Sequence, residues 1–368
     1  MRNLGLEYRD GGAVSKDQFS AVGYFQIALD AGDVPSLVYM GQFYEEGYGI
    51  VRKNSTMALQ LYKKAARAGN CEGMNAVGRC YFEGIGTQKD VRLAAASFQR
   101  SANAGDIYGM HSIGRLYIAG NGVPKDTAKG ISYMTSSADL GNTQAMFELG
   151  LIYSQGKITV VNHVKSFRYF EKAASLDHVA SMLNAAICSC NGQGTKVNHP
   201  MAAKYFKMAA DKGNAEGLKL LGLCYALGSG IDKDVRKAEE LLSASVKAGD
   251  NSAKELLDQL VANRIASEKA DIERQRLATI GPSPTVPQTN SVPQSRSNST
   301  NNDEYAKQAI AAGAIVGALL LGEWMFGGDT HPSGTCTLCH GTGGVYRGLG
   351  GTGSTFHSCV SCGGTGRQ

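Results

Sequence analysis

The sequence predicts an all-α fold, an α-solenoid of about seven helical hairpins that repeat with a period of about 36 residues. Two observations give this prediction: a glycine or aspartate recurs at a nearly constant interval, and the residues before it recur in a constant register. The recurring landmark is Gly32, Gly69, Gly105, Gly141, Asp177, Gly213 and Gly249. A fixed period of this size is typical of repeat proteins whose units pack on their neighbours.

Each unit ends in a helix whose beginning, packing face and end follow from the sequence. Fifteen residues before the landmark stands an Asp or Asn that can cap a starting helix: Asp17, Asn54, Asp90, Asp126, Asn162, Asn198 and Asp234. Eleven and four residues before the landmark the side chains are small, and seven before it the residue is large and apolar, which places them on one helical face. The large residues are Phe25, Tyr62, Phe98, Met134, Phe170, Phe206 and Leu242. The landmark glycine suits the left-handed residue that ends a helix.

Another helix precedes it in each unit and carries a Leu-Gly-x-x-Tyr pattern, as at 149–153. Glycine inside a helix costs about 1 kcal/mol relative to alanine, so its recurrence predicts close backbone contact with the small residues of the following helix. A turn with two glycines, such as Gly84 and Gly86, joins the helices. The unit at 185–189 has lost both Gly and Tyr, so an irregular stack is expected there. The chain also begins inside a first helix, either as a ragged cap or because residues precede it.

These residues resemble the Sel1-like repeat family, a branch of the tetratricopeptide-like α-solenoids, over residues 1–250. The resemblance implies a curved superhelix that binds partner proteins or peptides and assembles complexes, and it does not imply a reaction. We therefore expect a non-catalytic interaction scaffold or adaptor. The histidines and the glycine-rich turns form no catalytic or nucleotide-binding motif. A net charge of +5 without clustering gives no ground for nucleic-acid binding.

A partner-binding face is predicted at two positions, four residues apart, on the first helix of each unit. Its predicted residues are Gln42, Asn75, Arg79, His111, Arg115, Phe147, Leu151, Ile187 and Leu223. The first half of this face is polar and basic and the second half mainly apolar, which suits an extended or helical peptide with an acidic end and an apolar end. The alternative is that the apolar members belong to the core between repeats and the arginines are solvated.

Four further segments follow the repeats. A capping helix is predicted at 251–278, with its buried side formed by Leu256, Leu257, Leu260, Val261 and Ile265. Residues 279–304 are rich in Pro, Ser, Thr, Asn and Gln and are predicted to be a disordered linker.

An apolar helix is predicted at 305–327, and two interpretations of it stay open. It either docks on protein, including its own copy, or spans a membrane, although its uncharged run at 309–322 is shorter than the ~20 residues that a span needs. The N-terminus carries no signal-peptide pattern. The predicted location is cytoplasmic, or membrane-anchored through 305–326.

The cysteines of the repeats are scattered and predict no disulfide framework, which favours a reducing compartment. Cys80, Cys188 and Cys224 stand directly before the position at which the aromatic residue recurs, where other repeats have Phe43, Leu116 or Ile152. They are therefore expected to act as small core residues.

Metal chemistry is predicted at the C-terminus, 330–368, where Cys-x-x-Cys-x-Gly-x-Gly occurs twice. Cys336, Cys339, Cys359 and Cys362 supply four thiolates, the set that closes a tetrahedral zinc site. The segment resembles the cysteine-rich zinc module of the DnaJ chaperones, which has four such copies and two zinc sites. With two copies, the resemblance implies one zinc ion and permits a holdase-like assembly factor that holds an unfolded or assembling client. Haem attachment and thiol–disulfide exchange are the alternatives at these cysteines.

The full-length protein is expected to contain one zinc ion per chain, because a segment with so little apolar core needs the metal to be ordered. Cys336→Ser and Cys359→Ser should each lose the zinc and leave the helicity of the repeats unchanged. Atomic absorption and circular dichroism check this. A zinc-free protein with a reversible Cys336–Cys339 or Cys359–Cys362 disulfide would instead indicate an oxidoreductase.

Overall fold

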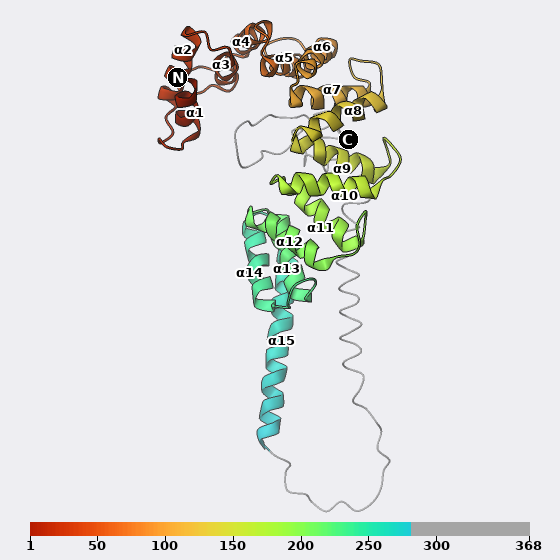
Figure 1. Cartoon of the computed structure of the whole chain (residues 1–368). Coiled ribbons are helices and arrows are strands. Elements are labelled where there is room, and N and C mark those ends of the chain that lie inside the picture. Colours follow the sequence, from red (N-terminus) through yellow and green to blue (C-terminus); the bar gives the residue numbers. More distant parts are fainter. Residues whose placement is uncertain (281–368) are drawn as a thin grey trace, which may run out of the picture. The chain divides into compact units, whose positions relative to one another are not determined.

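The computed structural model describes residues 1–280, and within this range the chain is helical and contains no strand (Figure 1). The helices are α1 (Arg2–Asp10), α2 (Gln18–Asp30), α3 (Val34–Glu46), α4 (Ser55–Arg67), α5 (Cys71–Glu83), α6 (Val91–Asn103), α7 (Ile107–Ala119), α8 (Thr127–Asp139), α9 (Thr143–Gln155), α10 (His163–Ser175), α11 (Val179–Asn191), α12 (His199–Asp211), α13 (Ala215–Leu227), α14 (Val235–Lys247) and α15 (Ser252–Ile280). The predicted all-α class is confirmed for these residues. The predicted apolar helix at 305–327 and the cysteine-rich segment at 330–368 lie outside them, as does nearly all of the predicted linker.

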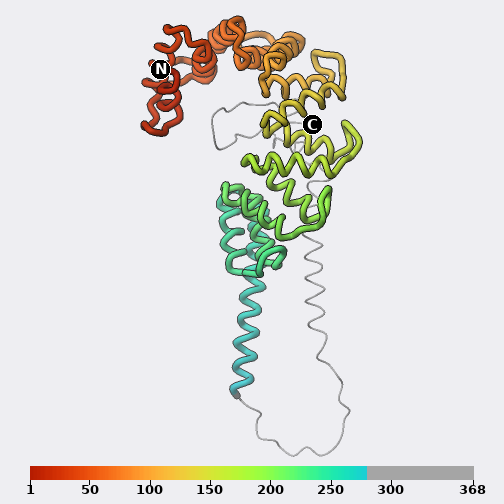
Figure 2. Tube along the Cα trace, viewed as in Figure 1, coloured from red at the N-terminus to blue at the C-terminus, as the bar shows by residue number. Residues whose placement is uncertain are grey.

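Two compact units divide the chain, one covering Met1–Ser181 and the other beginning at Met182. The first contains α1 to α10, the second contains α12 to α15, and α11 spans the boundary. Both are built from pairs of consecutive helices, and the trace reverses direction at each short turn between them (Figure 2). The predicted succession of helical hairpins is confirmed, with α15 following the last hairpin.

Side-chain caps begin the helices where the sequence predicts them. All seven predicted Asp and Asn residues accept a hydrogen bond from the first turn of the second helix of their hairpin. The N–H of Met57, for example, donates to Oδ1 of Asn54 at 3.0 Å. The first helices have a second series of caps that the sequence analysis missed, namely Asp33, Asn70, Asp106, Asn142 and Asn214. Both helices of these hairpins therefore have satisfied N-termini.

The predicted packing face of each second helix is buried. Its large residues, from Phe25 to Leu242, are at most 6% exposed, and its small residues are buried in every repeat. Where the small residue four positions before the landmark is serine, its hydroxyl donates to the first carbonyl of the preceding helix. Ser101 reaches Cys71 O at 2.9 Å, and Ser137 reaches Ile107 O at 2.6 Å. This bond fastens the two helices of a hairpin together.

The glycine in the middle of the first helix, present in every repeat but the sixth, makes the predicted close approach, but its main neighbour is the large residue of the second helix. A Cβ added at Gly150 would lie 2.5 Å from the ring of Phe170, and one at Gly78 would lie 2.6 Å from the ring of Phe98. Contact with a small residue also occurs, as at Gly114, whose added Cβ would lie 2.9 Å from the carbonyl of Gly130. The large side chain needs the space because it points across the hairpin onto the backbone of the first helix.

The fifth and sixth repeats keep a regular backbone, although Asp177 replaces the landmark glycine of the fifth and residues 185–189 of the sixth have lost Gly and Tyr. Asp177 has a φ of 64°, so it takes the left-handed conformation of the glycine it replaces, and asparagine and aspartate tolerate that conformation better than other residues. The turn closes as elsewhere, because the N–H of Asn198 donates to Ser189 O at 2.8 Å. The boundary between the two compact units follows shortly after Asp177, at Ser181.

The helix predicted at 251–278 corresponds to α15, which runs two residues past the predicted end. Leu256, Leu257, Leu260 and Val261 are half-buried, whereas Ile265 is 40% exposed, so its predicted burial is wrong. The helix continues beyond the part that α14 covers, and Arg264 marks the transition with an ion pair to Glu239 at 2.7 Å. Among residues 1–280, no helix has the length and apolar character needed to cross a bilayer.

Alanine at position 150 should destabilise the protein, whereas alanine at position 23 should stabilise it. A Cβ at Gly150 presses on Phe170, and overpacking costs about 1–3 kcal/mol, against a gain in helix propensity of about 1 kcal/mol. A Cβ at Gly23 meets nothing within 4 Å, so only the gain remains. Urea unfolding followed by circular dichroism measures both. An equal gain for Gly150→Ala and Gly23→Ala would show that Phe170 does not require the glycine.

Candidate functional site

The predicted partner-binding residues lie on the first helices of successive hairpins. In the first compact unit (Met1–Ser181) they are Gln42 on α3, Asn75 and Arg79 on α5, His111 and Arg115 on α7, and Phe147 and Leu151 on α9. We call this set the first-helix face. α3 contacts α5, and α5 contacts α7, more extensively than the second helices of these hairpins contact one another. The first helices α3, α5 and α7 thus lie in a row.

Arg79 is held by a carboxylate of the preceding hairpin. Its Nη1 and Nη2 lie 2.5 Å and 2.6 Å from Oε1 and Oε2 of Glu45, the two-point geometry in which Arg binds carboxylates most strongly. The hydroxyl of Tyr62 donates to the same carboxylate at 2.9 Å. Burial opposes ionisation of Glu45, but the hydrogen bond and charge of Arg79 outweigh it and hold the pKa of Glu45 below its usual range. Glu45 therefore joins two hairpins as an anion.

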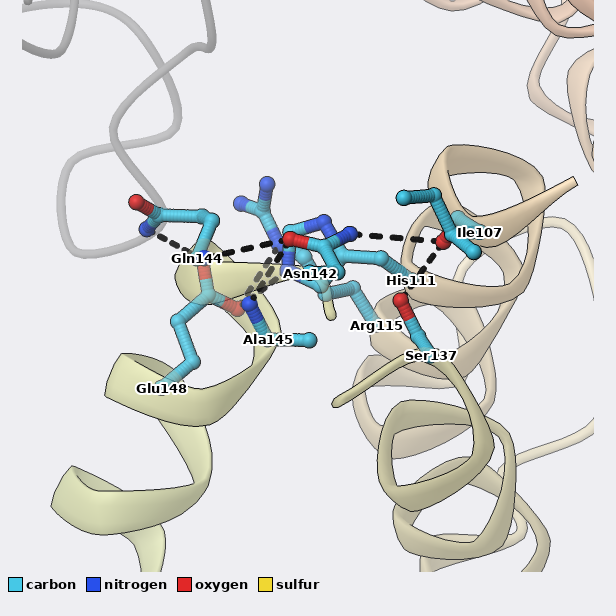
Figure 3. Close-up of polar contacts among 8 residues, drawn as sticks. All are labelled: Ile107, His111, Arg115, Ser137, Asn142, Gln144, Ala145 and Glu148. Carbon is cyan, nitrogen blue, oxygen red and sulfur yellow. Dashed lines mark hydrogen bonds and ion pairs between the residues drawn. The ribbon is translucent and has the colours of Figure 1, made fainter. Parts of the chain in front are cut away.

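Glu148 makes the corresponding bridge between the next pair of hairpins (Figure 3). Its Oε2 accepts a hydrogen bond from Nε2 of His111 at 2.9 Å and lies 3.7 Å from Nε of Arg115. Gln144 donates to Oε1 at 3.0 Å. Burial again opposes ionisation of Glu148, but the interactions with His111 and Arg115 outweigh it and keep the pKa of Glu148 well below its ordinary value. The carboxylate of α9 is therefore fixed against two side chains of α7.

Backbone contacts beside this bridge hold the two hairpins in register. Ile107 O accepts from Oγ of Ser137 at 2.6 Å and from Nδ2 of Asn142 at 3.3 Å. Oδ1 of Asn142 in turn accepts from the N–H groups of Gln144 and Ala145, each at 3.1 Å (Figure 3). One asparagine thus caps α9 and ties it to the beginning of α7.

The two bridges change the predicted electrostatics of the first-helix face. Each arginine faces a carboxylate from a neighbouring repeat, so the polar half carries balanced charge rather than a free basic surface. The arginines are not simply solvated either, because the side chains of Arg79 and Arg115 are only 19% and 24% exposed. The Nη groups of Arg115 make no hydrogen bond with any of residues 1–280.

The apolar members divide between core and surface. Val38 and Leu183, which lie four residues before Gln42 and Ile187 on the same helices, are 3% and 4% exposed and belong to the core. Phe147 and Leu151 are half-buried. In the second unit Ile187 is 8% exposed, and Leu223 of α13 is half-buried.

Glu45 and Glu148 contact predicted residues of the candidate site, and the sequence analysis missed both. Glu45 lies 34 residues before Arg79, and Glu148 lies 37 residues after His111. Both separations are close to the repeat period. An opposite charge about one period away from a predicted arginine or histidine was therefore the pattern that could have revealed them.

His178 takes the capping position that Asn or Asp occupies in other repeats. Its Nδ1 accepts from the N–H of Ser181 at 3.3 Å at the beginning of α11, and its ring lies 5.0 Å from that of Phe147. Burial lowers the pKa of His178 to about 4, although the charge of Glu148 acts in the opposite direction. The ring is therefore neutral at physiological pH and can accept this bond.

The five cysteines of residues 1–280 are free thiols. Cys80, Cys188 and Cys224 are buried, as predicted for core residues, and burial raises the pKa of each to about 12. Thiolates at these positions are therefore negligible at neutral pH. No cluster of His, Cys, Asp and Glu within residues 1–280 has the arrangement of a metal site. The predicted zinc ligands Cys336, Cys339, Cys359 and Cys362 lie outside this range.

Comparisons with known proteins agree with the hairpin architecture. The family model of the Sel1 repeat matches residues 1–33, 34–70, 71–106, 107–142, 143–178, 179–214 and 215–250. A protective antigen present in uropathogenic Escherichia coli strains, which displays an SLR fold, is 27% identical with a TM-score of 0.59, and the match covers 70% of this chain and 55% of the antigen. A Sel1 repeat protein from Oxalobacter formigenes is 24% identical with a TM-score of 0.57, covering 70% of this chain and 75% of that protein. The chain thus spans about half the length of the antigen. No curated protein matches it.

The stability of the protein is expected to fall between pH 7 and pH 4.5, partly through His178. The unfolded chain binds a proton near pH 6.5, whereas folded His178 stays neutral to about pH 4. Its stabilising contribution is therefore complete above pH 6.5 and is lost as pH falls towards 4.

His178→Asn keeps a cap of the type found at Asn70 and Asn142 but removes the titration. The variant should lose about 1–2 kcal/mol less stability than the wild type over this pH interval. Urea unfolding at both pH values measures the difference. Equal losses in the two proteins would mean that His178 takes up its proton without opening the beginning of α11.

Proposed function

The chain belongs to the Sel1 repeat family, and from that premise we propose that it is a non-catalytic scaffold whose repeats bind a partner protein or peptide along the first-helix face. Sel1 repeat proteins are generally non-catalytic protein-interaction scaffolds. The observation that carries the proposal for this chain is the set of side chains on α3, α5, α7 and α9, which are half-buried except for the buried His111. Bridges between hairpins hold Arg79, His111 and Arg115 in place.

Pre-organisation is the physical reason to expect binding on this row. Arg79 and Arg115 are already ordered by Glu45 and Glu148, so a partner loses little side-chain entropy when it contacts them. The Nη groups of Arg115 still have donors to offer to a carboxylate or a backbone carbonyl. Half-buried Phe147 lies on the adjacent helix and offers an apolar contact next to them.

These features define the partner's chemistry. We propose an extended or helical peptide that places acceptor groups, including acidic side chains, along Gln42, Asn75, Arg79 and Arg115, and apolar side chains against Phe147 and Leu151. Leu223 offers a further apolar contact in the second unit, whereas the burial of Ile187 leaves it little surface for a partner.

The segments beyond residue 280 enter the proposal on sequence grounds. Cys336, Cys339, Cys359 and Cys362 are proposed to bind one zinc ion, with an unfolded or assembling client as the proposed ligand of that tail. A docked helix and a membrane span both stay proposals for 305–327. Location in a reducing compartment such as the cytoplasm is supported by the use of cysteines as core residues in the repeats.

Site-specific photo-crosslinking in the native cell tests the first-helix face. Benzoylphenylalanine at Gln42 or Leu151 should give an adduct with one and the same partner. The matched controls are Gln60 of α4 and Arg168 of α10, exposed residues on the second helices of the same two hairpins. Adducts of equal yield from all four positions, or from none, would contradict the proposal.

Affinity for the captured partner should depend on Arg115. Arg115→Gln removes the Nη donors without adding charge and should weaken binding about tenfold, the loss of one hydrogen bond to a charged group. Glutamate is unsuitable here because it would face Glu148 and disturb the stack itself. Unchanged affinity of Arg115→Gln, with an unaltered circular dichroism spectrum, would exclude Arg115 from the binding site.

A further inference from the structure

A cavity of about 550 Å³ lies in the first unit, between α2, α3 and the turn that joins α3 to α4. Met40 and Tyr44 line it from α3, Phe19 and Gln26 from α2, and Ile50 from the turn. Its volume is within the range of sites that bind small ligands or single side chains. No residue of the first-helix face lines it, so it is a separate feature of the surface.

A glycine without a packing role leaves the cavity open. Gly23 lies inside α2 and lines the cavity, and a Cβ at this position would meet nothing within 4 Å. The corresponding residues of the other second helices all have side chains: Gln60, Ala96, Ser132, Arg168, Lys204 and Glu240. Glycine costs a helix about 1 kcal/mol relative to alanine. No packing contact requires a glycine here, so its only structural effect is to leave the space above α2 open.

The turn that borders the cavity is one residue longer than its counterparts. Seven positions separate Gly47 from Asn54, against six between Gly84 and Asp90. The longer turn is folded back on itself, because Tyr48 and Val51 exchange backbone hydrogen bonds of 3.0 Å and 2.9 Å.

Contacts with neighbouring elements anchor this turn. The ring of Tyr48 stacks on Phe43 at 4.4 Å, and the N–H of Gly49 donates to Oε1 of Gln18 at 3.1 Å. Ile50 is thereby held at the rim, 62% exposed, and Phe19 is 64% exposed. Two large apolar side chains thus border the cavity and remain uncovered.

Charge at the cavity has one sign. Arg52 and Lys53 are its charged lining residues, both are exposed, and no carboxylate lines it. Neither forms a hydrogen bond or ion pair with any of residues 1–280. Lys53 attracts Glu45 at longer range, but Arg79 already pairs with that carboxylate. Both cations are therefore available to a ligand.

We propose that this cavity is a docking site for an acidic segment of a partner protein, which inserts one large apolar side chain between Phe19 and Ile50. Carboxylates beside that side chain pair with Arg52 and Lys53. The apolar rim supplies the burial and the two cations supply the charge complementarity. The site is independent of the first-helix face and goes beyond the function proposed for it.

Synthetic peptides of defined sequence test the site with the full-length protein. The probes are fluorescein-labelled pentapeptides with a central leucine or phenylalanine flanked by two acidic residues on each side. The comparison peptides replace the acidic residues with lysine, or the central residue with serine. Fluorescence polarisation should show binding of the acidic apolar peptides and binding at least tenfold weaker for both comparison sets.

Variants assign the binding to the cavity. Gly23→Leu fills the open space, and Arg52→Glu or Lys53→Glu reverses the charge, so each should weaken binding at least tenfold. Their matched controls are Ala96→Leu and Lys125→Glu, exposed residues at the equivalent positions of other repeats, which should bind as the wild type does. Circular dichroism verifies folding, which Gly23→Leu should preserve because its Cβ lies in free space.

Three results would overturn the proposal: no binding of any acidic apolar peptide, equal affinity for the lysine peptides, or wild-type affinity in Gly23→Leu. Arg115→Gln separates this site from the first-helix face, because it should leave peptide affinity unchanged. Loss of peptide binding in Arg115→Gln would place the peptides on the first-helix face and would also overturn the cavity proposal.

Discussion

The rest of the structure depends on the packing of one large side chain over a glycine of the facing helix. In the fifth repeat Phe170 lies against Gly150, and the same relation recurs between Phe98 and Gly78. Because side chain and glycine sit at constant positions in the repeat, each hairpin closes at nearly the same spacing. Side chains one period apart are then placed within bonding distance, which is why Glu45 reaches Arg79 across two hairpins.

Function follows from this regularity and from the places where it is interrupted. Regular stacking turns variable positions of the first helices into a row, and carboxylates of neighbouring repeats fix its cations. At the longer turn after α3, one extra residue exposes Ile50, and the side chain that would cover the space beside it is absent at Gly23. The ordered row and the open cavity are thus proposed as two different kinds of binding surface on the same scaffold.

Sequence reasoning predicted the features that depend on local physics. Caps such as Asn54, the buried face that contains Phe170, and the positive φ at landmark glycines such as Gly141 each follow from neighbouring residues in the chain. It could not predict which residue the helix glycine approaches, nor that Glu148 neutralises Arg115, because both depend on how two helices are placed against each other. The exposure of Ile265 was missed for the same reason, since it is decided by where α14 stops covering α15.

A double-mutant cycle at Gly150 and Phe170 tests the central claim most directly. Unfolding free energies would be measured for Gly150→Ala, Phe170→Leu and the double variant. If ring and glycine fit each other, the shorter leucine will accommodate the added methyl group. The unfolding free energy of the double variant will then exceed the value predicted from the sum of the single changes by about 1 kcal/mol or more. Additive effects, within about 0.3–0.5 kcal/mol, would contradict the account, because they would show that the glycine and the ring contribute to the hairpin independently.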